Sequence, residues 1–221
     1  MAAVSSTLGI DFGTSNSAAG YMVDGKAQLI QVEGGETTLP TALFFDNEEK
    51  RIIFGREAQE ALIGGDDGRY MRALKSLLGT PLMRESRVLL GKRMDFIAIV
   101  ARFLAELKTR AETSTGQSFD RVLSGRPVMF HSSDEARNAQ ALVDLTECYE
   151  LAGFKDVRFM AEPEAAALAT VRFFHRATWG WLSISGVVLR ILRCFGRREM
   201  QVSTSLPVKA CVLAARTLTG G

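Results

Sequence analysis

The order of apolar and polar positions along the chain predicts alternating strands and helices. Residues 8–13 form a largely apolar run that ends in glycine, and residues 17–23 are interpreted as its returning partner strand, followed by the tight turn Asp24-Gly25. Further strands are predicted at 26–32 and 42–45, which would make the opening a β-meander. This start differs from the strand–helix–strand start of a dinucleotide-binding domain.

Helical patterns follow at 56–64 and 69–78, broken by a glycine-rich segment, and apolar residues recur at helical spacing over 96–112. A strand is predicted over 121–130, then a helix that a capping segment starts at 132–135 and that ends near residue 152. A strand over 155–160 and a helix opening at Glu162-Pro163 complete the pattern. The sequence therefore predicts an α/β fold with a mixed sheet, flanking helices and a small inserted subdomain over about 35–95.

The charge pattern divides the chain after residue 170. The chain holds 27 basic and 25 acidic residues, but residues 171–221 contain eight basic residues and only one acid, Glu199, which leaves 19 basic and 24 acidic residues in 1–170. A mildly acidic body does not suggest a nucleic-acid binder, so no nucleic-acid partner is expected. The basic tail, 171–221, shows no sustained period and is predicted to be poorly structured.

Cysteine spacing and hydropathy predict a cytoplasmic protein without a membrane anchor. Cys148, Cys194 and Cys211 lack metal-ligand spacing, and the N-terminus lacks a basic region followed by a long apolar run. No segment reaches the roughly 20 apolar residues that span a bilayer. Cys148 is interpreted as core filling, and His131 as a surface residue at a strand end.

The loop after the first strand carries candidate phosphate-binding chemistry. Asp11 ends the strand, and the loop continues with Gly13, Thr14, Ser15 and Asn16. A phosphate chain needs backbone N–H groups that approach closely, hydroxyl donors, and a carboxylate to hold hydrated magnesium. Because the same residue types favour an ordinary hairpin turn, the loop alone leaves both interpretations open.

Four segments resemble, in order, the seventy-kilodalton heat-shock protein (DnaK-like) chaperones of the actin-like ATPase superfamily. IDFGTSNS at 10–17 is similar to the phosphate-1 signature, and ALKSLLG at 73–79 to the segment whose lysine lies beside the γ-phosphate. RPVMFHSSDEAR at 126–137 resembles the strand, proline and helix-start region, with a proline-to-arginine spacing two residues longer. MAEPEAAAL at 160–168 is close to the glutamate-proline segment that ends the first lobe. The pattern is most similar to the YegD-like group of the family.

The resemblance implies a ribonuclease H-like first lobe over 1–170 of a chaperone ATPase that uses ATP or ADP with magnesium. It implies that Asp11 holds magnesium through water, that Lys75 stabilises the transferring phosphate or its attacking water, and that Glu162 helps to hold the metal shell. The remaining implied site residues are the phosphate contacts Gly13, Thr14, Ser15 and Asn16 and the interlobe switch Pro127 and Arg137. Protein clients or co-chaperones would be partners of the intact protein.

Simpler interpretations stay open for each residue. Lys75 could be an exposed helix lysine and Glu162 a helix-start acid, while Pro127 and Arg137 could end a strand and decorate a helix. Other functions also stay open: a sugar or acetate kinase or an actin-like filament protein of the same superfamily, or a non-enzymatic interaction lobe.

The second phosphate loop that the resemblance implies is not visible after Glu162, so the chain is expected to be truncated after the first lobe, with little or no hydrolysis. One allowed codon choice for residues 180–191, read from its third base, encodes LVVDIGGGTTD, which is similar to the missing phosphate-2 signature. We hypothesise that residues from about 171 are out of frame, through a frameshift or a sequencing error. The alternative is a genuine divergent basic tail that binds a partner.

Overall fold

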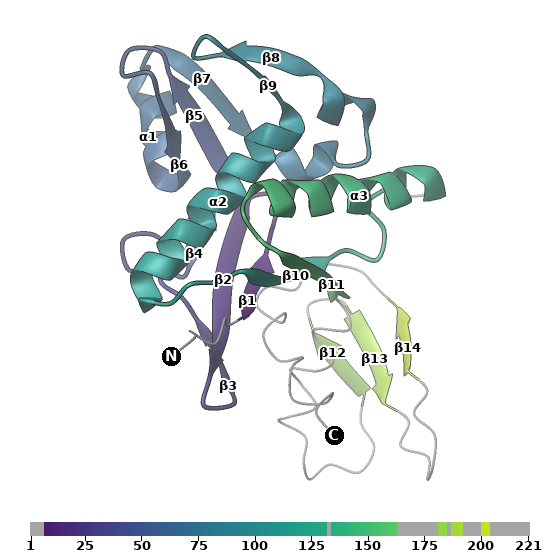
Figure 1. Ribbon diagram of the computed structural model, residues 1–221. Coiled ribbons are helices and arrows are strands. Elements are labelled where there is room, and N and C mark those ends of the chain that lie inside the picture. Colours follow the sequence, from purple (N-terminus) through teal and green to yellow (C-terminus); the bar gives the residue numbers. More distant parts are fainter. Residues whose placement is uncertain (1–6, 132–133, 163–180, 185–186, 192–199, 204–221) are drawn as a thin grey trace.

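The central element of the fold is a mixed β-sheet with two long helices packed on it (Figure 1). The computed structural model describes residues 7–131, 134–162, 181–184, 187–191 and 200–203. The sheet has the strand order β11-β10-β1-β2-β3, and β4 pairs with β2. Its elements are β1 (Thr7–Asp11), β2 (Asn16–Val23), β3 (Lys26–Leu29), β4 (Thr38–Pro40), β10 (Arg121–Arg126), β11 (Asp156–Ala161) and the helices α2 (Phe96–Thr115) and α3 (Glu135–Leu151).

Parallel pairing within this sheet sets the position of the candidate site. β1 runs parallel to β10, and β10 runs parallel to β11, whereas β2 and β3 return antiparallel as a hairpin ladder. The Asp24-Gly25 turn between β2 and β3 has positive φ at both residues, 48° and 73°, as a tight hairpin turn requires. The carboxyl ends of β1, β10 and β11 therefore meet at one edge of the sheet.

A smaller layer lies between β4 and α2 in the sequence and at the top of Figure 1. Its sheet has the order β6-β5-β7, helix α1 contacts β5, and a separate hairpin, β8–β9, precedes α2. The elements are β5 (Ala42–Asp46), β6 (Arg51–Phe54), α1 (Gly55–Gly64), β7 (Gly68–Arg72), β8 (Ser86–Leu89) and β9 (Lys92–Asp95), with short 3-10 helices at Leu74–Leu77 and Pro81–Arg84. Its assignment as an inserted subdomain stays a prediction.

Both long helices form where the sequence predicts them because each has an apolar face and a side-chain cap. In α2, Asp95 accepts a hydrogen bond from the Ala98 N–H at 2.8 Å, and Gly116 ends the helix in a left-handed conformation. In α3, Asp134 accepts from the Arg137 N–H at 2.9 Å. The buried face of α2 and the inner residues of β1 belong to the same hydrophobic core.

Three predictions of local structure are wrong. Residues 69–78 are not a helix, because Gly68–Arg72 pairs with β5 as strand β7 and a 3-10 helix follows. The strand predicted over 121–130 ends at Arg126, directly before Pro127, which has no N–H for further pairing. Residues 42–45 are a strand but join the second sheet, so the opening meander stops at β3.

Three short strands are described within the tail, and the prediction that the tail as a whole is poorly structured stays a prediction. β12 (Trp181–Ile184), β13 (Val187–Ile191) and β14 (Met200–Ser203) form a three-stranded antiparallel sheet. These segments are rich in the β-branched and large apolar residues that suit strands. The predicted helix beyond Glu162 and the rest of the tail lie outside the described residues. Within the described part of the chain, no helix is long and apolar enough to cross a membrane.

Candidate functional site

The first part of the site is the loop between β1 and β2. Leu8 and Ile10 are fully buried in β1, and Phe12, directly after Asp11, turns into the core against Phe103 of α2, with ring centroids 6.0 Å apart. Because its two neighbours, Ile10 and Phe12, are both fully buried, Asp11 is held at the carboxyl end of β1 with a partly exposed side chain. The core therefore fixes the base of the loop.

The loop itself folds too tightly for a side chain at its glycine. A Cβ at Gly13 would lie 2.1 Å from the backbone oxygen of Asn16, so no other residue fits without moving the loop. The Ser15 carbonyl accepts a hydrogen bond from the N–H of Thr41, the residue between β4 and β5, and this bond ties the loop to the connection of those strands at 2.9 Å. Thr14 and Ser15 are exposed. The loop is thus anchored from beneath while its hydroxyl groups face outward.

The second part of the site is Glu162, which directly follows β11. In the register of the parallel strands, Ile10 lies level with Ser124, and Gly125 lies level with Met160. Asp11 is therefore level with Met160, and Glu162 lies two residues farther along on the same edge of the sheet, two strands away, which is a lateral distance of about 10 Å at the usual spacing of roughly 4.8 Å per strand. Ligands of open α/β sheets bind at such carboxyl edges.

The third part is Lys75, which the structure places against Glu162. Lys75 lies in the 3-10 helix after β7, and its Nζ is 3.1 Å from Glu162 Oε1, although the two residues are 87 positions apart. Their side chains are 12% and 22% exposed. Lys75 is therefore not the exposed helix lysine of the simpler interpretation, and its charge is directed to the sheet edge where Glu162 lies.

Sequence reasoning missed the residues that hold the Lys75 segment. Asp144 of α3 is 1% exposed, and its carboxylate accepts hydrogen bonds from the Gly79 N–H at 2.9 Å and from Arg84 Nη2 at 3.0 Å. Arg84 also pairs with Glu147 at 2.8 Å, and this hydrogen bond raises the pKa of the guanidinium. The only local signal is an aspartate between buried apolar positions of α3, and that signal does not identify its partners.

His131 also differs from its sequence interpretation. Its Nε2 lies 2.6 Å from the Leu78 carbonyl oxygen, so the ring donates to the backbone of the Lys75 segment rather than lying free on the surface. The Phe130 and His131 N–H groups both donate to Asn138 Oδ1, which fixes the chain before α3. His131 therefore links the segment after β10 to the end of the Lys75 segment.

The structure does not join the two predicted switch residues by an ion pair or hydrogen bond. Pro127 follows β10, and its carbonyl accepts from Arg126 Nη1 at 3.3 Å. The guanidinium of Arg137 pairs with Asp134 at 3.1 Å in the first turn of α3 and is half exposed. A switch role for Pro127 and Arg137 stays a prediction.

A buried hydrogen bond supports the middle strand of the site. The Tyr149 hydroxyl lies 2.7 Å from Ser124 Oγ, and both residues are fully buried. Burial raises the pKa of Tyr149, and the nearby carboxylate of Asp11 adds to that increase. The neutral tyrosine thus forms a hydrogen bond with Ser124 of β10, the residue that pairs with Ile10 near the end of β1.

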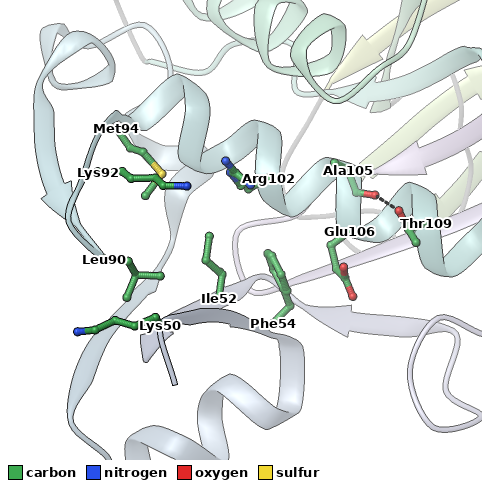
Figure 2. A pocket seen from close by; sticks show the side chains of 10 residues that line it. All are labelled: Lys50, Ile52, Phe54, Leu90, Lys92, Met94, Arg102, Ala105, Glu106 and Thr109. Atoms are coloured by element: carbon green, nitrogen blue, oxygen red, sulfur yellow. Dashed lines mark hydrogen bonds between the residues drawn. The ribbon is translucent and has the colours of Figure 1, made fainter. Parts of the chain in front are cut away.

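The cavity drawn in Figure 2 lies elsewhere. It has a volume of about 660 Å³ and is bordered by β6, the β8–β9 hairpin and α2, with Ile52, Phe54 and Met94 among its lining residues. None of the predicted site residues lines it. Among the described residues there is also no group of three or more His, Cys, Asp or Glu side chains placed to bind a metal ion directly.

A comparison with protein-family models gives one match to this region. Residues 7–89 match the model of the Hsp70 protein family. The match includes Asp11, the loop of residues 13–16, and Lys75, whereas Glu162 lies beyond it. The mixed α/β fold around these residues is compatible with the first lobe of an actin-like ATPase, and over residues 7–89 the chain is similar to the Hsp70 family.

Proposed function

We propose that residues 1–170 form the ATP-binding first lobe of an Hsp70-like chaperone ATPase. The observation that carries the proposal is the convergence of three separate segments, the Asp11 loop, Lys75 and Glu162, at the carboxyl edge of parallel strands. The family match over residues 7–89 supports it independently. The YegD-like placement within the family is part of the proposal and rests on sequence resemblance.

The residues fit a magnesium-bound phosphate chain. The turn at Gly13 is too tight for a side chain, since a Cβ there would meet the Asn16 carbonyl oxygen, and Thr14 and Ser15 add exposed hydroxyl donors. Two carboxylates, Asp11 and Glu162, stand on the same edge and could hold the water shell of magnesium, which neutralises phosphate charge when bound.

In this proposal each side chain has a defined task. Lys75 exchanges its contact with Glu162 for a γ-phosphate oxygen and stabilises the charge that develops there. Asp11 would help to hold hydrated magnesium, and Gly13, Thr14, Ser15 and Asn16 would donate to the phosphates. The described residues supply these contacts from one side of the phosphate chain, so we expect weak nucleotide binding and negligible hydrolysis by this chain.

Thermal unfolding with and without magnesium-ATP tests the proposal. A ligand that binds only the native protein at ten times its Kd adds about 1.4 kcal/mol, which corresponds to a rise of about 3–5 °C for a chain of this size. We expect this rise for the unaltered chain and for Asp156→Ala, a control at the opposite edge of the sheet, but not for Asp11→Ala. A stable fold with no nucleotide dependence would instead favour a non-enzymatic interaction lobe.

We also propose that residues from about 171 are out of frame, as the resemblance of an alternative frame to a second phosphate loop suggests. Sequencing the coding DNA tests this directly. Codons at 180–191 that encode LVVDIGGGTTD from the third base would support the proposal. Codons incompatible with that motif would leave the genuine basic tail as the explanation.

A further inference from the structure

The segment that carries Lys75 follows strand β7, which pairs with β5, and side chains from elsewhere in the chain bind its C-terminal end. Gly79, four residues after Lys75, donates its N–H to Asp144 Oδ2 at 2.9 Å, in a buried position. The Leu78 carbonyl next to it accepts from His131 Nε2 at 2.6 Å. The peptide group that joins Leu78 to Gly79 is thus bound at both its carbonyl and its N–H, by a side chain that precedes α3 and by one on α3.

The Asp144 carboxylate is itself held rigidly. Its second oxygen accepts from Arg84 Nη2 at 3.0 Å and from Gln140 Nε2 at 2.9 Å, so three donors satisfy a side chain that is 1% exposed. A buried charge is tolerated only with such partners. Asp144 therefore defines a fixed point to which the Gly79 N–H is attached.

Close packing leaves the turn no other position. Gly79 has φ +78°, and a Cβ there would lie 2.2 Å from the carbonyl oxygen of Arg137 and 3.1 Å from Ala141 Cβ. The turn is therefore pressed directly against the first turns of α3. The backbone of the Lys75 segment cannot shift toward α3, and the Asp144 bond prevents it from moving away.

We infer that Asp144 is a positioning residue that fixes Lys75 for the γ-phosphate by holding the Gly79 turn against α3. The inference rests on the proposed function, because it assigns the γ-phosphate to Lys75. It also links the position of α3 to the γ-phosphate, because the Gly79 turn packs against the backbone carbonyl of Arg137 in α3. Misplacement of a phosphate-binding group by about 1 Å can cost up to two orders of magnitude in function.

The test compares ATP and ADP affinity, because only ATP carries the group that Lys75 contacts. Magnesium-ATP and magnesium-ADP are titrated into the full chain and followed by backbone amide NMR, which also reports the Gly79 N–H directly. Asp144→Ala is expected to lower the preference for ATP over ADP roughly tenfold, as loss of a charge-assisted contact would, while ADP affinity stays unchanged. In the same variant the Gly79 amide proton should move upfield and exchange faster.

The matched control is Glu147→Ala, which removes the other ion pair of Arg84 on the same helix without touching Gly79. It should keep the ATP preference. Lys75→Ala should lose the preference, and adding Asp144→Ala to it should cause no further loss, because the two residues act as one unit. If Asp144→Ala does not fold, Asp144→Asn carries the test, since its single amide oxygen is expected to accept from the two donors Arg84 and Gln140, which places the NH2 group against the Gly79 N–H and removes that bond.

The outcomes separate the two claims. An unaltered chain that shows no preference for ATP overturns the proposed function and this inference with it. An unaltered chain that prefers ATP, together with a folded Asp144 variant that keeps the preference, overturns the inference alone. Additive losses in the Lys75 and Asp144 double variant would also contradict it.

Discussion

Replacing Tyr149 by phenylalanine removes one hydroxyl from the centre of the fold and leaves the ring packing intact. The hydroxyl lies 2.7 Å from Ser124 Oγ, and both residues are 0% exposed. The ring also contacts Phe154 and Phe159, with centroids 5.8 Å and 6.2 Å away, and these contacts survive the change. The variant therefore isolates one buried hydrogen bond beneath the candidate site.

The expected cost follows from what Ser124 loses. A neutral buried hydrogen bond contributes about 1 kcal/mol net, and a buried hydroxyl left without a good partner costs about 1–3 kcal/mol. Ser124 retains only a 3.3 Å contact to the Gly125 carbonyl. We therefore expect Tyr149→Phe to lower the free energy of unfolding by about 1–2 kcal/mol at neutral pH, measured by urea denaturation. Tyr21→Phe, at a partly exposed tyrosine, should change it by less than about 0.5 kcal/mol.

The pH dependence gives a second, independent readout. Burial raises the pKa of Tyr149 above its ordinary value of 10.0. Above about pH 10 the unfolded tyrosine ionises while the folded one stays neutral, so the unaltered protein loses about 1.4 kcal/mol per pH unit that Tyr149→Phe does not lose. The stability difference between the two proteins should shrink accordingly. A difference that is near zero at neutral pH, or constant up to pH 11, would refute this account of the buried pair.

Two further predictions concern the glycines and the buried thiol. Gly55→Ala and Gly116→Ala each place a side chain at a similar φ, +68° and +67°, but of these two only the Cβ at Gly55 would meet other atoms, the side chains of Glu33 at 2.2 Å and Leu39 at 2.4 Å. We expect urea denaturation to show that the free energy of unfolding falls by about 2–4 kcal/mol for Gly55→Ala and by about 1 kcal/mol for Gly116→Ala. Equal losses would contradict the packing argument. Burial raises the pKa of Cys148, so peptide mapping after iodoacetamide treatment of the native chain at pH 9 should find Cys148 unmodified; rapid modification at the rate of a free thiol would contradict its burial.

The sequence predicted the elements whose signals are local. The strand β1, the Asp24-Gly25 hairpin and the capped helices α2 and α3 each carry their own pattern of apolar spacing, turn residues or caps, and these predictions are confirmed. Strand β7 was mistaken for a helix because a short run with arginine at both ends, 69–72, suits either period. Its pairing with β5 decides between them, and that pairing is a tertiary contact.

The candidate site could be predicted only as a set of separate motifs. Resemblance suggested Asp11, Lys75 and Glu162 individually, but the 3.1 Å contact between Lys75 and Glu162 joins segments 87 residues apart. The role of Asp144 was hidden for the same reason, since its backbone partner, Gly79, lies 65 residues earlier. No local pattern of hydrophobic and polar residues contains that information.

The central claim is that a magnesium nucleotide binds at the carboxyl edge formed by the Asp11 loop, Lys75 and Glu162. The most direct measurement is amide NMR of the chain with ATP and paramagnetic Mn²⁺ in place of magnesium. The account predicts selective broadening of residues 11–16, Lys75 and Glu162, which Asp11→Ala abolishes. Broadening centred on Ile52 and Met94, at the cavity of Figure 2, would contradict it, as would no localised broadening at all.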